Sequence, residues 1–172
     1  MHSKKVKNME DRKILAIDPG NEYSGYVVIG AEDMRPLEIG KVENEIVIER
    51  VLKGDYTELV IEMVASYGMP VGRSVFETCV HIGRLMQAAS SVSIKTARLY
   101  RQDVKLNICH SNRATDATIT QALIDRFAPC TPNRGKGYKK EPGWFYGFKA
   151  DIWQAYALAV TYLDLEKEER DF

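Results

Sequence analysis

Three acidic residues of this sequence stand where carboxylates could act together in chemistry. Asp18 and Glu62 each end a short run of apolar residues, and Asp151 opens a late apolar segment that has the length of a helix. A carboxylate at the end of a buried strand is costly unless another group compensates its charge. A divalent cation could compensate all three at once and could activate water for hydrolysis. The three positions therefore predict a metal-binding site.

Each of these acids also has a simpler interpretation, which the sequence leaves open. Asp18 is followed at once by Pro19-Gly20, and Asp is a common residue before such a turn. Glu62 could pair with a nearby arginine. Asp151 could simply be favoured at a helix start by the helix dipole.

Two further titratable residues carry weaker signals. His81 lies within a predicted helix, where we expect it to pack or to face solvent. Asp116 lies near another predicted helix start. Capping or interaction with the helix dipole is a simpler role for it than metal ligation.

The composition is that of one soluble globular domain. The chain has 172 residues, of which 45% are hydrophobic and 28% are charged, and this length permits a substantial core. No apolar stretch is long enough to span a bilayer, and the N-terminus lacks the apolar segment of a signal peptide. The three cysteines have the spacing of neither a disulfide framework nor a zinc site. We therefore expect a cytoplasmic protein with reduced thiols and no membrane partner.

Charge is distributed unevenly along the chain, although the net charge is zero. Residues 63–150 carry 13 basic and 5 acidic side chains, a net charge of +8, whereas the segments before and after this block each carry a net charge of −4. Local positive charge, rather than the total, attracts a phosphate backbone. The basic block is therefore compatible with a nucleic-acid partner, and a chance segregation of surface charge explains it equally well.

The pattern of apolar residues predicts strands first and then strands and helices in turn. The predicted strands cover residues 13–18, 26–29, 37–42, 59–62 and 92–97. The predicted helices cover residues 45–52, 74–89, 113–127 and 149–167. This order predicts a mixed α/β sheet flanked by helices. We expect a disordered lead-in over residues 1–12, one domain over 13–167 and an acidic tail over 168–172.

The motifs around the three acids resemble those of a known family. Asp18-Pro19-Gly20, with Gly25 seven positions after the Asp, is similar to the first motif of the ribonuclease H-like superfamily and, more specifically, of the RuvC family of Holliday junction resolvases. The region 62–89 resembles the second motif region of that family, and the segment 151–161 resembles its last helix. The resemblance covers about residues 13–163. It implies a ribonuclease H-like mixed five-stranded sheet flanked by helices.

The resemblance also implies an activity and a set of site residues. It implies a metal-dependent endodeoxyribonuclease that resolves four-way DNA junctions by paired nicks. Asp18, Glu62 and Asp151 would be catalytic and would hold Mg²⁺ or Mn²⁺, with two ions per site. A homodimer is expected because the two-fold symmetry of a junction matches that of a C2 dimer.

One site position departs from the pattern of the resembled family. Gln154 stands where the family usually has an acid, three residues after Asp151. Both side chains would lie on the same side of the helix. Gln154 is therefore grouped with the catalytic residues, although it offers only a neutral oxygen.

Two segments contain candidates for contact with DNA. Basic residues among glycines suit contact with backbone phosphates, and exposed aromatic rings can stack on unpaired bases. The candidates in the loop 128–148 are Arg134, Lys136, Tyr138, Lys139, Lys140 and Trp144. The candidates after the Glu62 strand are Tyr67, Met69 and Arg73. For the first loop, a solvated segment with an aromatic anchor to the core is the alternative interpretation.

Several other functions fit the same motifs. A nuclease that acts on flaps, R-loops or other branched DNA would have the same site residues. A non-catalytic DNA-binding relative is compatible with Gln154. A phosphotransferase of the actin-like ATPase superfamily also begins with an acidic hairpin, but it needs two such domains, and this chain has the length of one.

Overall fold

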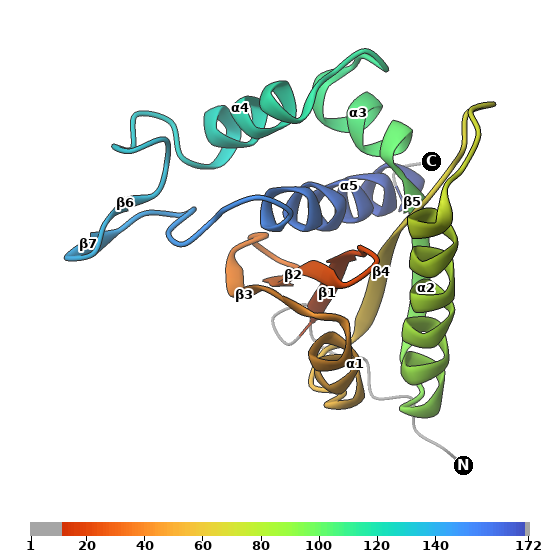
Figure 1. The fold of residues 1–172 in the computed structure, drawn as a ribbon. Coiled ribbons are helices and arrows are strands. Elements are labelled where there is room, and N and C mark those ends of the chain that lie inside the picture. Colours follow the sequence, from red (N-terminus) through yellow and green to blue (C-terminus); the bar gives the residue numbers. More distant parts are fainter. Residues whose placement is uncertain (1–11, 171–172) are drawn as a thin grey trace.

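A five-stranded mixed sheet in the order β3-β2-β1-β4-β5 organises residues 12–170, which are the part of the chain that the computed structural model describes (Figure 1). The strands are β1 (Lys13–Asp18), β2 (Tyr23–Gly30), β3 (Pro36–Glu43), β4 (Glu58–Met63) and β5 (Lys95–Tyr100). The first three strands form an antiparallel meander, whereas β1, β4 and β5 run parallel. The predicted mixed five-stranded sheet is confirmed.

Helices cover both faces of this sheet. They are α1 (Asn44–Leu52), α2 (Arg73–Ser91), α3 (Arg101–Cys109), α4 (Asp116–Phe127) and α5 (Ile152–Arg170). One face packs against α5, and the other packs against α1 and α2. Helices α3 and α4 lie on the far side of α5, so that α5 is enclosed between them and the sheet (Figure 1). No helix among the described residues is long and apolar enough to cross a membrane.

The alternation of side chains along β1 and β4 divides the core into two parts. Ala16 and Val60 belong to the cluster around α5, whereas Ile17 and Ile61 belong to the cluster around α1 and α2. Successive side chains of a strand point to opposite faces. The next residues along each strand, Asp18 and Glu62, therefore follow the α5 face.

Helix α5 is apolar on all sides, which matches its position. All residues from Ile152 to Leu163 are buried, and a helix that is apolar all round is a core helix in a protein of this kind. The helix runs on to Arg170, beyond the predicted end at residue 167. The predicted acidic tail 168–172 therefore begins inside a helix. Residues 171–172 and residues 1–11 of the predicted lead-in lie outside the described part of the chain.

Two elements differ from those that the sequence predicts. The strand predicted at 92–97 is β5 at 95–100, because Val92 and Ser93 form the turn that ends α2 and Ser93 has a φ of 59°. Helix α3 has no counterpart among the predicted elements. Only Val104 is buried in this short helix, so its sequence lacks a clear apolar stripe.

The loop between α4 and α5 contains one small regular element. Strands β6 (Gly137–Tyr138) and β7 (Glu141–Pro142) form a two-stranded ladder. This hairpin projects at the end of the molecule away from α2 (Figure 1).

Candidate active site

Two of the predicted site residues lie side by side at the ends of parallel strands. Ile17 of β1 pairs with Ile61 of β4, so Asp18 and Glu62 follow in the next row. Both line one cavity of about 240 Å³, together with Tyr67 and Arg101. The carboxyl ends of parallel strands thus bring together two acids that are 44 residues apart in the sequence.

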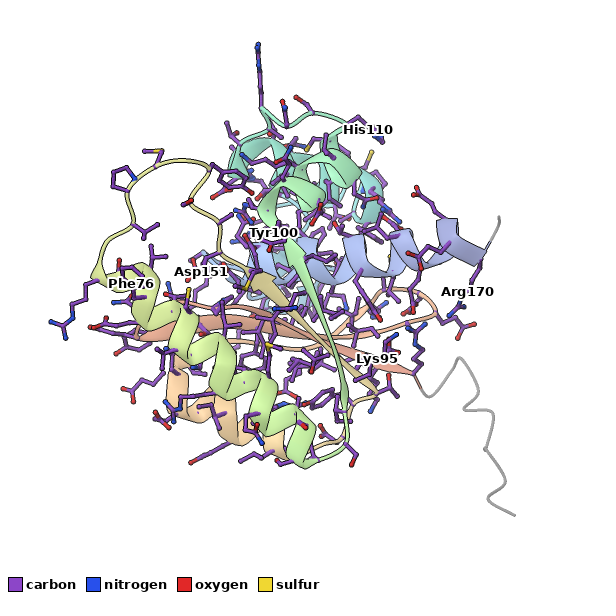
Figure 2. All side chains as sticks on the ribbon, turned by 90° about the vertical axis from the view of Figure 1, so that its right-hand side faces the viewer. Phe76, Lys95, Tyr100, His110, Asp151 and Arg170 are labelled. Atoms are coloured by element: carbon purple, nitrogen blue, oxygen red, sulfur yellow. The ribbon has the colours of Figure 1, made fainter. Side chains whose placement is uncertain are left out.

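Asp151 reaches the same edge of the sheet from the opposite direction, immediately before α5. Asp18, Gly25 and Lys41 form one row across β1, β2 and β3. Gly25 leaves space for Asp151, because a Cβ atom at position 25 would lie only 2.7–2.8 Å from the carbonyl group and Cβ of Asp151. Figure 2 shows Asp151 near the edge of the sheet at which Tyr100 ends β5. The structure therefore brings the three predicted carboxylates to one place.

The environment disfavours ionisation of Asp18. Its pKa is raised to about 8, first by burial and then by the negative charges of Glu62 and Asp151, while Arg101 acts in the opposite direction. Burial also raises the pKa of Glu62, again opposed by Arg101. Carboxylates in this situation gain stability from a nearby cation.

Two basic side chains already provide part of that compensation. Nζ of Lys41 lies 2.6 Å from Oδ2 of Asp151, and Nη1 of Arg101 lies 3.3 Å from Oε2 of Glu62. In this arrangement, no three His, Cys, Asp or Glu side chains among residues 12–170 are grouped closely enough to hold a metal ion. Metal binding would require Lys41 and Arg101 to release their partners and the carboxylates to turn inward.

The donor set nevertheless fits a hard divalent cation. Carboxylate and amide oxygens are the ligands that Mg²⁺ and Mn²⁺ prefer. Gln154 is only 8% exposed, and its Oε1 atom has no hydrogen-bond partner among residues 12–170. A buried polar oxygen without a partner is costly. Gln154 lines a second cavity of about 300 Å³ with Asp151, so a ligand in this cavity would lie close to the Gln154 side chain.

The loop after β4 borders the first cavity. Tyr67, Met69 and Arg73 are all exposed, but only Tyr67 lines the cavity that contains Asp18. Tyr67 has a φ of 48°, an unusual value that for a residue other than glycine often occurs at functional sites. Arg73 instead forms an ion pair with Glu77 on the same helix, at 2.7 Å.

The basic loop reaches the site at one residue. Arg134 lines the second cavity beside Asp151 and Gln154. Tyr138, Lys139 and Lys140 are exposed on the β6–β7 hairpin or its turn, whereas Lys136 is half-buried. Lys136 directly precedes the hairpin, the other three residues lie in it, and none of the four lines either cavity.

Trp144, a predicted DNA-contact residue, packs against the core. Its ring stacks on Phe127 with 5.5 Å between the centroids, and its Nε1–H donates to Oη of Tyr156 at 3.0 Å. Arg35 lies over the same ring. Trp144 is thus held against the core, and the alternative interpretation of an aromatic anchor applies to this residue.

A buried polar network supports the turn after Asp18. The Gly20 N–H donates to Oγ of Ser24 at 3.3 Å, and Nδ2 of Asn44 donates to the Gly20 carbonyl at 3.0 Å. Ser24 Oγ also donates to Oδ1 of Asn44 at 2.7 Å and lies 3.2 Å from Nε2 of His81. His81 therefore links α2 to this turn, a role that its position in the sequence does not reveal.

The basic residues of the site, Lys41 and Arg101, are absent from the residues that the sequence predicts. Arg101 directly follows β5, and Glu62 lies near the same end of the neighbouring strand β4. The strand predicted at 92–97 begins three residues before β5, so the prediction does not place Arg101 at a strand end. Lys41 lies opposite Gly25 in the pairing of β2 with β3. Both signals depend on exact strand register, which the sequence pattern leaves undetermined.

Comparisons with known proteins identify the fold. A scan of the sequence against protein-family models gave no match, and neither did a search of curated proteins. The structure is similar to a RuvC structure from Thermus thermophilus, with a TM-score of 0.67 and 15% sequence identity, over 91% of this chain and 96% of that chain. It is also similar to T. thermophilus RuvC in complex with Holliday junction substrate, with a TM-score of 0.68 and 15% identity, over 92% and 96% of the two chains. The expected ribonuclease H-like fold of the RuvC type is confirmed.

The raised pKa of Asp18 predicts a pH-dependent stability without metal. Between the pKa of about 4 of an unfolded Asp and the folded pKa of about 8, the folded protein keeps a proton that the unfolded chain has released. Its stability should therefore fall as pH rises, by up to about 1.4 kcal/mol for each pH unit. Asp18→Asn should remove this part of the slope. Urea unfolding in EDTA from pH 5 to pH 8 measures it.

The matched control for this measurement is Asp125→Asn, at an exposed position of α4. The control should keep the wild-type slope. Equal slopes for the wild type and Asp18→Asn would contradict the proposed crowding of negative charge at Asp18.

Proposed function

We propose that this protein is a metal-dependent endodeoxyribonuclease that resolves four-way DNA junctions. The observation that carries the proposal is the convergence of Asp18, Glu62 and Asp151, from β1, β4 and the start of α5, at one edge of a RuvC-like sheet. The 15% identity to T. thermophilus RuvC supports the fold alone. The reaction is therefore inferred from the chemistry of the carboxylates.

Each acid has a distinct place in the proposed mechanism. Two divalent ions bound there would supply the Lewis acid and the activated water of phosphodiester hydrolysis. Asp18 lies on the central strand beside both other acids, so it is the residue placed to hold both ions. Glu62 and Asp151 would each hold one side. The Gly20 turn keeps the backbone next to Asp18 compact, because a Cβ atom there would lie 2.3 Å from the Tyr23 carbonyl oxygen.

Lys41 and Arg101 would gain a second role when their carboxylates bind metal. Each side chain lies next to the reacting centre through its present ion pair. Once released, an ammonium or guanidinium group at this position can neutralise phosphate oxygens. These two residues would therefore help to hold the scissile phosphate.

The choice of DNA as the substrate is supported by the surroundings of the site. Tyr67 and Arg134 border the two cavities, and the segment 63–150 carries the net charge of +8. The T. thermophilus protein was solved with a Holliday junction substrate, which favours a four-way junction. Flaps, R-loops and other branched DNA are the alternatives, together with a non-catalytic DNA-binding relative.

A homodimer would suit this substrate, and α2 offers a surface for it. Phe76 and Val80, four residues apart on one face of α2, are 60% and 66% exposed. Large exposed apolar side chains that are grouped on a helix are typical of an interface. The start of α2 also follows the loop of Tyr67, so two subunits joined there could act on one junction. We propose a C2 dimer through this face.

The first test of the function is cleavage of labelled DNA with Mg²⁺ or Mn²⁺. The wild type should nick a four-way junction in pairs and more rapidly than a flap, an R-loop or a duplex. Asp18→Asn, Glu62→Gln and Asp151→Asn should each lower the rate by roughly 10²-fold or more, the scale of removing one strong electrostatic interaction with a transition state. Binding of the junction in EDTA should be retained.

Asp125→Asn again provides the control and should cut at the wild-type rate. Cleavage by Asp18→Asn at that same rate would remove Asp18 from the mechanism. A wild type that binds junctions but cuts none of these DNAs with either metal would instead favour the non-catalytic alternative.

The second test concerns the exposed lysines of the basic loop. Lys139→Gln combined with Lys140→Gln should weaken junction binding and reduce the slope of log affinity against log salt by about 0.9 for each phosphate that is no longer neutralised. The matched control changes Lys13 and Lys95, two exposed lysines at the opposite ends of their strands from the site. Junction binding measured at several salt concentrations should give a reduced slope for the Lys139 and Lys140 variant and the wild-type slope for the Lys13 and Lys95 variant. Equal slopes would exclude the loop from DNA binding.

The third test concerns the dimer. Phe76→Glu should raise the dimer dissociation constant by at least tenfold, since removal of a central aromatic side chain from an interface typically costs about 2 kcal/mol or more. Leu37→Glu, at a 55% exposed apolar position of β3, should leave it unchanged. Sedimentation equilibrium measures both. A monomeric wild type at tens of micromolar, with or without junction DNA, would refute the proposed dimer.

A further inference from the structure

We propose that Asp116, at the first turn of α4, is a metal ligand of the active site and supplies the negative charge that Gln154 lacks. This inference rests on the metal-dependent function proposed above. It adds to the site a residue from a helix that carries none of the three predicted acids.

The start of α4 does not need Asp116 as a cap. Thr115 is the N-cap residue, and its Oγ1 accepts from the Thr118 N–H at 3.3 Å. The Thr118 hydroxyl accepts from the Thr115 N–H at 2.8 Å in return. This reciprocal pair satisfies two backbone donors at the start of the helix, as a capping box does. The carboxylate of Asp116 is therefore free for another role.

The carboxylate of Asp116 points toward the site. It forms an ion pair with Nη2 of Arg101, whose Nη1 contacts Glu62. One guanidinium group thus joins Asp116 to Glu62. The negative charge of Asp116 also contributes to the raised pKa values of Asp18 and Glu62, which is a consequence of the same proximity.

Asp116 and Gln154 face a common space. Both line the cavity of about 300 Å³ that Asp151 and Arg134 also border. The Gln154 side chain is buried, and its Oε1 atom lacks a hydrogen-bond donor in the described part of the chain. Two carboxylate side chains and one amide side chain thus line the same cavity, and such a lining favours a positively charged ligand. Three oxygen-bearing side chains of this kind match the ligands of Mg²⁺ and Mn²⁺.

The charge of the site supports the same conclusion. Three carboxylates leave two divalent ions with one excess positive charge, whereas the four carboxylates of Asp18, Glu62, Asp116 and Asp151 balance them. A carboxylate on α4 therefore replaces the one that α5 lacks at position 154. Arg101 keeps Asp116 and Glu62 together until a cation takes its place.

Metal binding to the full protein without DNA tests the proposal. Titration calorimetry with Mn²⁺ and Mg²⁺ should show that Asp116→Asn lowers the affinity for at least one ion by tenfold or more. Removal of an outer-sphere partner alone typically costs about 10–100-fold. Asp125→Asn, an exposed Asp on the same helix, should bind like the wild type. Asp116→Asn combined with Gln154→Asp should recover most of the affinity of the wild type.

An indirect effect through Arg101 is separated by a second pair of variants. Arg101→Gln should bind metal more tightly than the wild type, because a competing cation is removed. If Asp116 is a ligand, adding Asp116→Asn to Arg101→Gln should again lower the affinity by tenfold or more. If Asp116 acts only by holding Arg101, this addition should have no effect, and the proposal would be overturned.

The outcomes also distinguish this proposal from the proposed function. Metal binding that depends on Asp116, in a protein that cuts no branched DNA, would support the ligand and refute the nuclease. Junction cleavage by a protein whose metal affinity is unchanged in Asp116→Asn would overturn the ligand and leave the nuclease intact. A wild type that binds neither Mn²⁺ nor Mg²⁺ would overturn the ligand.

Discussion

The close packing of α5 on the sheet is the contact on which the rest of the site depends. Gly25 has no side chain, so the backbone just before α5 approaches β2 and brings Asp151 next to Asp18. The buried segment 152–163 then holds this position through contacts on all sides, with the sheet below it and with α3 and α4 above it. A rigid scaffold therefore carries the third carboxylate, as the proposed metal site would require.

This packing creates a second constraint, because it crowds acids into a poorly solvated place. Burial and mutual repulsion raise the pKa of Asp18 to about 8, and Lys41 and Arg101 offset part of the repulsion through ion pairs. Natural proteins often depart from the best local electrostatics at functional sites, where the cost is met by packing elsewhere. The unpartnered oxygen of Gln154 is another such departure.

Much of the fold and the three acids could be predicted from the chain itself. The strands that contain Asp18 and Glu62 are short apolar runs, so both acids could be predicted to lie at strand ends. The apolar character of 152–160 similarly indicates a buried helix. Helix α3 and the position of β5 could not be predicted. Helix α3 has a single buried residue, so it shows no apolar stripe. The apolar run that suggests a strand at 92–97 begins in the turn that ends α2, so the predicted strand starts before β5.

The sequence by itself determined that Asp18, Glu62 and Asp151 stand at the ends of apolar segments, because residue type and position beside an apolar run are local properties. Only the tertiary structure decided which of them meet and what surrounds them. The pairing of Lys41 with Asp151, the bridge from Arg101 to Asp116 and the anchoring of Trp144 on Phe127 all join residues that are distant in the sequence. Such contacts depend on strand register and helix packing, and a shift of one residue in register turns every side chain of a strand to the other face.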